Sequence, residues 1–372
     1  MTLKFESFFK IAAILAAATI GDGVFALPYV FYTAGWLVGC VYLVLLAGIV
    51  IVAHVIYLKV LEKENEKERL LGLSRKYFGN IGFAIGFFSI VAGLLLAMTA
   101  FLVLGSSFLG LLFPSADSAL LLLLFWLAIA LPVFLADGRV IGLELLGIIC
   151  TSALIVSVFV LAWPHAGFGS AARVGSGNLF LPFGVILFSL AGWTGIEPAY
   201  ETRRRDGTKG FSPVAMVAAG TVFAAALYLL FVAGILGSAT QITADTLSGL
   251  SNWPLWQKTA LAALGFLAVW TISIPTSREI KNSLEKDLRW PSVAARSLIV
   301  FLPPLLVLAG FNNFLFIVGF AGGLFLSIQY LLMIAVGLRV LALSPWKKAA
   351  LSVVAAVFLL AAVYEVYVFI VR

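Results

Sequence analysis

The feature that most restricts this sequence is its series of long apolar runs, which repeat along the whole chain. A run of about 20 apolar residues is long enough to cross the hydrocarbon core of a bilayer as a helix. Of the 372 residues, 63% are hydrophobic and only 11% are charged, which is far from the composition of a soluble domain. The chain is therefore predicted to be an all-α polytopic membrane protein with a single transmembrane domain over residues 1–372.

Apolar runs and turn signals together predict eleven transmembrane helices. We expect them at approximately 8–33, 35–60, 81–113, 118–136, 140–163, 179–200, 212–237, 258–280, 293–310, 312–340 and 346–371.

The distribution of basic residues supports this count, because cytoplasmic loops of membrane proteins carry an excess of Lys and Arg. With the N-terminus in the cytoplasm, all but three of the 24 Lys and Arg residues fall on the cytoplasmic side, the exceptions being Arg173, Lys258 and Arg372. The predicted location is the cell membrane, with the N-terminus cytoplasmic and the C-terminus outside. The same loops account for the formal charge of +7, so no nucleic-acid partner is expected.

Cysteine and histidine are too sparse to indicate a disulfide framework or a metal site. Cys40 and Cys150 lie inside apolar runs, where a cysteine behaves as a small buried hydrophobe. His54 and His165 are scattered along the chain, whereas a metal site needs clustered ligands. We expect no metal and no cofactor.

Two connections between spans are long enough to carry structure of their own. Segment 61–78 is charged first and amphipathic later, which fits either a short helix on the cytoplasmic membrane surface or a solvated loop. Segment 238–257, on the predicted outer side, is expected to form a small external cap.

Two of the predicted spans are interrupted in the middle by glycines. The first carries Gly-Asp-Gly at 21–23, followed by Pro28, and the sixth carries Gly-Trp-Thr-Gly at 192–195, followed by Pro198. Lipid tolerates broken backbone only where it is buried in protein or lines a cavity. An ionisable residue at that depth, such as Asp22, marks a candidate functional site.

The positions of the two interruptions predict an inverted repeat. Spans one to five and six to ten each form a five-helix unit, over about 8–163 and 179–340. Because five is odd, the second unit starts on the opposite side of the membrane, so the two units are inverted. Corresponding interrupted helices in inverted halves indicate the binding site of a secondary transporter. Residues 346–371 then form an extra helix.

Three stretches of the sequence resemble one group of transporters. Residues 21–29 followed by 34–36 are similar to the first-span signature of the amino acid/auxin permease and aromatic amino acid permease families. Residues 71–79 resemble their first cytoplasmic loop, and 318–323 their tenth span. The resemblance implies the LeuT-like 5+5 inverted-repeat fold of the amino acid–polyamine–organocation (APC) superfamily, with interrupted helices 1 and 6. Asp22 departs from the family pattern, which usually has a small or hydroxylated residue there.

The chemistry of the paired breaks fits both charged groups of an amino acid. The first half of span 1 ends with free carbonyls near Ile20, and the second half begins with free N–H groups at the positive end of its helix dipole. The N–H groups suit a carboxylate, and the carbonyls of both half-helices suit an ammonium. The predicted substrate-binding residues are Ile20, Gly21, Asp22, Gly23, Val24, Phe25, Phe188, Ala191, Gly192, Trp193 and Thr194.

Phe188 resembles the aromatic residue that closes over the substrate in this superfamily. Trp193 is a candidate for the floor or gate of the pocket. Plain packing is the alternative for both side chains.

Three interpretations of Asp22 stay open. It is an N-cap residue that stabilises its own helix by about 1 kcal/mol. Or it is protonated when substrate binds, because burial favours the uncharged form of a carboxyl group, and it then carries the coupled proton. Or it pairs with the ammonium of a substrate that is cationic or lacks a carboxylate.

Coupling to protons is favoured over coupling to sodium. Asp22 and Glu197 are the candidate proton carriers, and Glu197 is alternatively a helix N-terminal carboxylate. For sodium, the superfamily resemblance directs attention to hydroxyl groups on span 8, where Thr271 and Ser273 lie at a suitable depth. Hydroxyls in membrane helices also bond to carbonyls of their own helix, which is the simpler interpretation of both residues.

The expected function is secondary active, ion-coupled uptake of neutral amino acids, with apolar or aromatic ones suited to a pocket containing Phe188 and Trp193. The alternatives are a transporter of cationic amines or cationic amino acids that uses Asp22 as counter-ion, and a passive channel. A channel requires a continuous polar stripe, whereas the polar residues here cluster at the breaks. No catalytic set is present, so an enzyme is not expected. The expected partners are an amino acid and the lipid bilayer.

Overall fold

The computed structural model describes the backbone of residues 2–64, 69–134, 137–162, 179–205, 212–239, 241–244, 246 and 253–371. Within these ranges, the side chains of residues 2–6, 137–148 and 162 are not described.

The described elements are helices. In chain order they are α1 (Thr2–Thr19), η1 (Asp22–Ala26), α2 (Leu27–Ala34), α3 (Trp36–Glu64), α4 (Leu70–Phe87), η2 (Phe88–Ala92), α5 (Gly93–Leu112), α6 (Ser118–Ala130), η3 (Leu131–Phe134), α7 (Asp137–Ala162), α8 (Leu181–Ser189), η6 (Trp193–Gly195), α9 (Ile196–Arg205), α10 (Pro213–Ser238), α11 (Leu255–Asn282), η8 (Ser283–Asp287), α12 (Ser292–Leu308), α13 (Phe314–Phe320), η9 (Ala321–Leu326), α14 (Ser327–Val340) and α15 (Pro345–Val371).

Within the described residues, seven helices are long and apolar enough to cross a membrane. An eighth span results if the bent pair Ser7–Thr19 and Asp22–Ala34 is taken as one. Shorter apolar helices occupy Ser118–Phe134, Ile149–Leu161 and Ser292–Leu308. The chain is thus an all-helical, multi-pass membrane protein, while the count of eleven spans stays a prediction.

Several helices begin where the sequence supplies a side-chain cap. The Asp117 carboxylate accepts hydrogen bonds from the N–H groups of Ala119 (2.9 Å) and Leu120 (3.3 Å) at the start of α6. The Asn313 side chain accepts one from Phe316 (2.9 Å) at the start of α13. Ser212 caps α10 and is followed by a proline, whose missing N–H costs nothing at that position.

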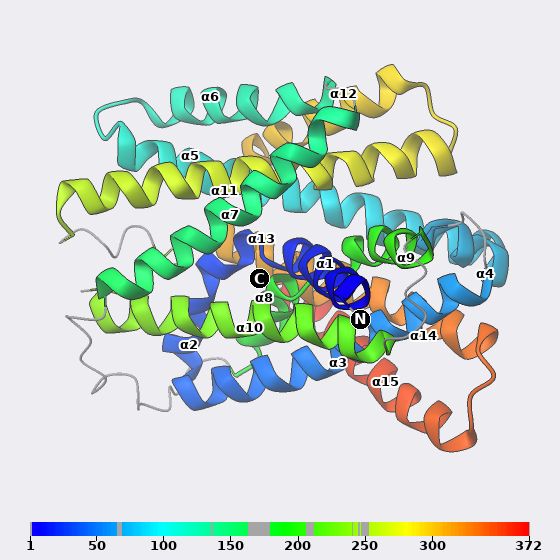
Figure 1. Ribbon diagram of the computed structural model, residues 1–372. Helices are drawn as coiled ribbons and strands as arrows, with labels where there is room; N and C mark the ends of the chain where they lie inside the picture. The colour runs from blue at the N-terminus through cyan, green and yellow to red at the C-terminus, as the bar shows by residue number, and fades with distance from the viewer. Residues whose placement is uncertain are drawn as a thin grey trace.

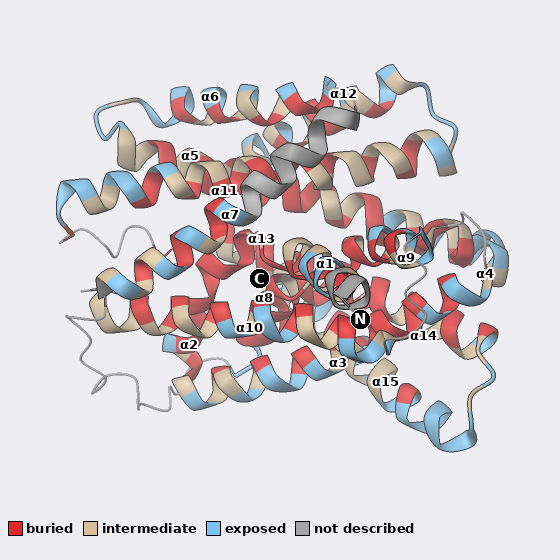
Figure 2. Cartoon of the chain, viewed as in Figure 1, coloured by how far each residue is buried: buried red, intermediate tan, exposed pale blue. Residues whose placement is uncertain are grey.

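The interrupted spans lie in the middle of the bundle. Figure 1 shows α5, α6, α11 and α12 on one side and α3, α10 and α15 on the other, with α1, α8 and α13 between them. Figure 2 shows that the buried residues are concentrated in this middle region, while the outer helices carry exposed residues on their outward faces.

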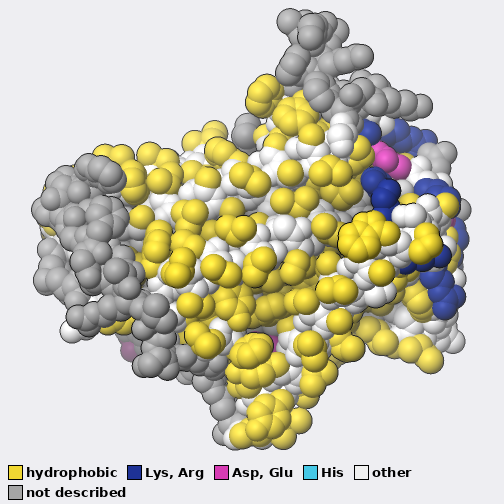
Figure 3. All heavy atoms as spheres, turned by 90° about the horizontal axis from the view of Figure 1, so that it is seen from below, with side chains coloured by type: hydrophobic (Ala, Val, Ile, Leu, Met, Phe, Trp, Pro, Cys, Tyr) yellow, Lys and Arg dark blue, Asp and Glu magenta, His cyan; other side chains and the backbone are white. Residues whose placement is uncertain are grey.

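The outer surface is apolar except at one end. Figure 3 shows hydrophobic side chains over most of one face, and Lys and Arg side chains gathered at one end of the helices, which we call the basic end. Only 17% of the apolar window of α15 is buried inside the protein. Such an apolar exterior suits contact with lipid chains.

Segment 61–78 is mostly helical. α3 continues to Glu64, and the described chain resumes at Arg69, just before α4. Gly79 then has φ = +62°, a value that favours glycine, and it kinks α4 ahead of the membrane span. The short-helix interpretation therefore fits residues 70–78, whereas residues 65–68 lie outside the described residues. In segment 238–257, residues 240, 245 and 247–252 also lie outside them.

Close backbone contact holds α8 against η9. A Cβ atom placed on Gly184 would lie 2.2 Å from the carbonyl oxygen of Gly319, and one on Gly322 would lie 1.8 Å from the carbonyl oxygen of Gly184. Only glycines permit this approach, which fixes the first half of the sixth predicted span. The described cysteines, Cys40 and Cys150, are both free.

Candidate substrate site

Both predicted interruptions are present. α1 ends at Thr19, and the chain bends by 52° before it continues as η1 and α2. α8 ends at Ser189, and the chain continues through a short unwound stretch into η6 and α9. The two glycine-containing stretches therefore mark real breaks in the helices.

The two breaks are in direct contact with each other. A Cβ atom on Gly23 would lie 2.8 Å from Cα of Ser189 and 3.1 Å from Cδ1 of Phe188. A Cβ atom on Gly192 would lie 2.1 Å from Oγ1 of Thr19. Because real Cβ atoms do not approach other atoms this closely, both positions require glycine. The glycines thus allow the unwound segments to pack backbone against backbone.

Tyr228 of α10 joins the ends of the two first half-helices. Its hydroxyl oxygen lies 2.5 Å from the carbonyl oxygen of Thr19 and 2.7 Å from the carbonyl oxygen of Ser189. These are the last residues of α1 and α8, where helix carbonyls have no partner within their own helix. The Tyr228 side chain is fully buried. A phenol hydroxyl therefore donates at the place where the sequence predicted an ammonium.

Asp22 is buried at the first break, with 4% of its surface exposed. Its carboxyl group accepts from the backbone N–H of Gly23. The other oxygen, Oδ2, is buried and has no hydrogen-bond partner among the described residues. The N-cap residue of η1 is Gly21 and not Asp22, which is the first residue of η1. Because the carboxyl group nevertheless accepts from the first N–H groups of its own helix, all three interpretations of Asp22 stay open.

The remaining predicted substrate residues lie around the breaks and are buried to different extents. Ile20, Val24, Phe25, Gly192 and Trp193 are buried, whereas Phe188, Ala191 and Thr194 are half-buried. Phe25 stacks edge-on against Phe108 and Phe231, so its ring is a packing element. Its carbonyl accepts a hydrogen bond from the Thr246 hydroxyl.

The predicted span 8 corresponds to α11, and an apolar side chain of this helix contacts the first break. A Cβ atom on Gly21 would lie 2.6 Å from Cδ1 of Ile272 on α11. The neighbouring Thr271 hydroxyl donates to the carbonyls of Leu267 and Ala268, and the Ser273 hydroxyl donates to that of Trp270. Both hydroxyls thus bond within their own helix. Among the described residues, no group of three or more His, Cys, Asp or Glu side chains is placed to hold a metal ion.

Glu197 belongs to a different polar cluster, toward the basic end, which we call the Arg69 cluster (Tyr57, Arg69, Glu197 and Glu279). The Tyr57 hydroxyl donates to Glu197 at 2.7 Å. The Arg69 guanidinium pairs with Glu197 at 3.0 Å and with Glu279 at 3.0 Å. These contacts join α3, α9, α11 and the segment that leads into α4. The structure therefore does not bring Glu197 together with Asp22.

The guanidinium of this cluster stays charged. Burial alone would lower the pKa of Arg69, but the nearby carboxylates of Glu279 and Glu197 outweigh burial and raise that pKa above its ordinary value. One cation is thus shared between two carboxylates.

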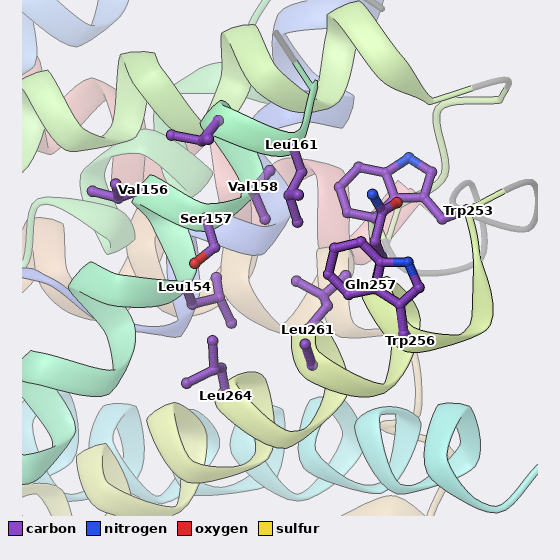
Figure 4. A pocket seen from close by; sticks show the side chains of 12 residues that line it. Leu154, Val156, Ser157, Val158, Leu161, Trp253, Trp256, Gln257, Leu261 and Leu264 are labelled. Atoms are coloured by element: carbon purple, nitrogen blue, oxygen red, sulfur yellow. The ribbon is translucent and has the colours of Figure 1, made fainter. Parts of the chain in front are cut away.

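A cavity of about 330 Å³ lies away from the breaks, between α7 and the beginning of α11. Figure 4 shows its lining, which includes Leu154, Ser157, Trp253, Trp256 and Gln257. None of the predicted substrate residues lines it.

Sequence reasoning missed Tyr228 and three members of the Arg69 cluster. The sequence did indicate a role for Tyr228, because a tyrosine hydroxyl in the middle of an apolar run needs a hydrogen-bond partner when it is buried. Arg69 and Glu279 are separated by 210 residues, so no local pattern connects them.

Two interrupted helices in direct contact, inside an all-helical multi-pass protein, are the arrangement with which secondary transporters bind their substrates. The family comparison agrees, because residues 5–171 match the family model described as "Transmembrane amino acid transporter protein". The resemblance to amino acid permeases is thereby confirmed over this part of the chain. No curated protein sequence matches the chain.

Solved transporter structures share the fold. The chain is similar to a manganese transporter of Eremococcus coleocola, with a TM-score of 0.66, 13% identity, and coverage of 98% of this chain and 86% of that chain. It is similar to MhsT in complex with L-phenylalanine, with a TM-score of 0.63, 14% identity, and coverage of 96% and 97%. The inward-facing conformation of Mhp1 has a TM-score of 0.58, 14% identity, and coverage of 95% and 88%.

Proposed function

We propose that this protein is a secondary active transporter that takes up neutral amino acids, including apolar or aromatic ones, by alternating access. The observation that carries the proposal is the direct contact between the two helix breaks, which places the carbonyl ends of α1 and α8 on one hydroxyl group. The match of residues 5–171 to an amino acid transporter family supports it. The fold shared with MhsT, solved with L-phenylalanine, supports an aromatic substrate.

The proposed architecture has eleven spans in a 5+5 inverted repeat, with the N-terminus in the cytoplasm and the C-terminus outside. The gathering of Lys and Arg side chains at one end supports this orientation. In this arrangement Phe188, which is half-buried beside Gly23, closes over the substrate, and the buried Trp193 forms the floor of the pocket.

The proposed coupling ion is the proton, carried by Asp22. Its buried carboxyl oxygen lacks a partner among the described residues, which suits a group that gains and loses a proton during transport. The same observation supports a second candidate function, transport of cationic amines or cationic amino acids with Asp22 as counter-ion.

The test is uptake into proteoliposomes of a panel of labelled neutral and cationic amino acids and amines, with imposed pH or sodium gradients. The proposal expects neutral amino acids to accumulate inside only when the outside is more acidic. Accumulation of cationic substrates alone would favour the second function. If no substrate accumulates under any gradient, the proposed function is wrong.

A further inference from the structure

The cavity between α7 and the beginning of α11 lies outside the proposed substrate site, and the proposed function does not use it. Its volume of about 330 Å³ is in the range of protein pockets that hold small ligands. α7 and α11 pack against each other, but their side chains do not fill this space. An unfilled space forfeits the van der Waals contacts that a ligand would make with its walls.

The cavity lies near the end of α11 that is opposite the basic end. Its lining residues on this helix run from Trp256 to Leu264, in the first three turns. Glu279, in the last turns of the same helix, belongs to the Arg69 cluster toward the basic end. Because a helix of 28 residues is about 42 Å long, the two sites are on opposite sides of the membrane core. In the proposed orientation the cavity is at the depth of the outer leaflet.

The cavity opens sideways toward lipid. Val160 and Trp256 line it and are 58% and 62% exposed, and Val156 and Ala260 are exposed lining residues as well. They belong to two apolar helical stretches, Ile149–Leu161 and the span that begins at Leu255. Exposed apolar surface on such helices contacts lipid chains. A ligand therefore enters from the bilayer.

The lining changes in character along α11. Gln257 and the indole rings of Trp253 and Trp256 lie together at the beginning of the helix, as Figure 4 shows. Tryptophan is favoured there, at the boundary between membrane and water. Leu261 and Leu264 follow one and two turns further along and are apolar. None of the twelve described residues that line the cavity is Asp, Glu, Lys, Arg or His.

We propose that this cavity binds an uncharged, hydroxyl-bearing lipid of the monoacylglycerol class from the outer leaflet. The acyl chain lies along the apolar wall between α7 and α11, and a hydroxyl of the head bonds to the Gln257 amide. Lipid chains are as apolar as leucine, so the chain alone gives no preference over bulk lipid, and the head decides the selection. A charged head would lose water without meeting a charged side chain, which disfavours it.

The experiment is photo-crosslinking of the full-length protein in phosphatidylcholine nanodiscs, with a monoacylglycerol that carries a diazirine in its chain. Digestion and mass spectrometry locate the labelled residues, which we expect within 154–161 and 253–264. Unlabelled monoolein should compete at a concentration about fivefold lower than methyl oleate, which has the same chain but no hydroxyl. In Gln257→Leu, the two competitors should act at the same concentration.

Ala260→Trp tests the cavity itself. Ala260 lines the cavity and is exposed, so a tryptophan there occupies the space with little strain on the fold. We expect labelling of the two segments to fall by at least about tenfold. The matched control is Ala356→Trp, which adds the same side chain at an exposed position of α15, away from the cavity lining, and should leave the labelling unchanged.

Three results would overturn the proposal. They are labels spread evenly over the lipid-facing helices, equal competition by monoolein and methyl oleate in the unmodified protein, and unchanged labelling in Ala260→Trp. The competition on the unmodified protein keeps the proposal open to refutation even if a variant does not fold. Because labelling needs no transport and no residue of the breaks is altered, failure of uptake and failure of lipid binding are separate results.

Discussion

The polar cluster at the helix breaks and the Arg69 cluster are both enclosed by apolar helices, but they balance donors and acceptors differently. In the Arg69 cluster, the guanidinium and the Tyr57 hydroxyl donate to Glu197 and Glu279 at distances of 2.7–3.0 Å. At the breaks, one Tyr228 hydroxyl serves two carbonyls, and an oxygen of Asp22 lacks a partner among the described residues.

This difference separates a structural cluster from a binding cluster. Buried polar groups are normally paired, so a cluster that pairs its donors and acceptors internally holds elements together. A buried cluster with surplus acceptors is costly to the protein alone, and a ligand with donors offsets that cost. The Arg69 cluster therefore joins α3, α9 and α11, while the breaks carry the proposed substrate site.

The largest predicted effect follows from removing the guanidinium of the Arg69 cluster. Arg69→Met removes the cation shared by Glu197 and Glu279 and leaves both carboxylates without it. Their side chains are only 14% and 11% exposed. We expect the free energy of unfolding to fall by about 3 kcal/mol, measured by denaturant unfolding in detergent.

The exposed Arg204 offers the control for this change, since Arg204→Met is expected to alter stability by less than about 0.5 kcal/mol. The triple variant Arg69→Met/Glu197→Gln/Glu279→Gln should recover most of the loss, because it removes the unpaired charges as well. A loss below about 1 kcal/mol in Arg69→Met would show that this cluster is not structural.

A second prediction concerns a variant that pushes the two helix breaks apart without changing any charge. Gly23→Ala places a methyl group 2.8 Å from Cα of Ser189, so the two breaks must move apart. We expect initial uptake per molecule to fall at least tenfold in proteoliposomes, in line with about 1–3 kcal/mol of overpacking. Gly48→Ala adds the same methyl group where no atom lies within 4 Å, and it should transport normally. Equal uptake by the two variants would contradict contact between the breaks as the basis of the site.

A third prediction concerns the carboxyl group of Asp22 at the first helix break. A gradient of one pH unit supports about tenfold accumulation when one proton is coupled to each substrate. Asp22→Asn cannot exchange a proton, so we expect it to equilibrate substrate across the membrane without accumulating it. The measurement is steady-state uptake with and without an acidic exterior. If Asp22→Asn still accumulates substrate with an unchanged pH dependence, Asp22 is not the proton carrier.

The smallest predicted effect concerns the two hydroxyls of α11. Thr271 and Ser273 bond to carbonyls of their own helix, while Ile272 faces the first break. We expect Thr271→Ala and Ser273→Ala each to change uptake by less than about twofold, with or without sodium. A strong loss of uptake confined to sodium-containing buffer would instead make these residues part of a cation site.

The sequence allowed the membrane class and both breaks to be predicted, because each depends on a local pattern. Long apolar runs can only be buried in lipid or protein, and Gly-Asp-Gly at 21–23 and Gly-Trp-Thr-Gly at 192–195 interrupt such runs. For segment 61–78 the sequence left a short helix and a solvated loop open, because the segment is charged first and amphipathic later, and the helix that begins at Leu70 fits the first of these.

The partners within the site were not predictable from local patterns. Tyr228 is separated by 209 residues from Thr19, the residue whose carbonyl it contacts. Glu197 follows the second break directly in the sequence, yet the direction of α9 carries it to Arg69. Contacts of this kind depend on how spans pack against each other, which a single sequence does not encode in its spacing.

The most direct test of substrate binding at the breaks is a cryo-electron microscopy structure of the protein with the amino acid that it transports best. We predict density for the substrate nitrogen within hydrogen-bond distance of the carbonyl oxygens of Thr19 and Ser189. Substrate density that lies elsewhere, for example in the cavity between α7 and α11, would contradict the account.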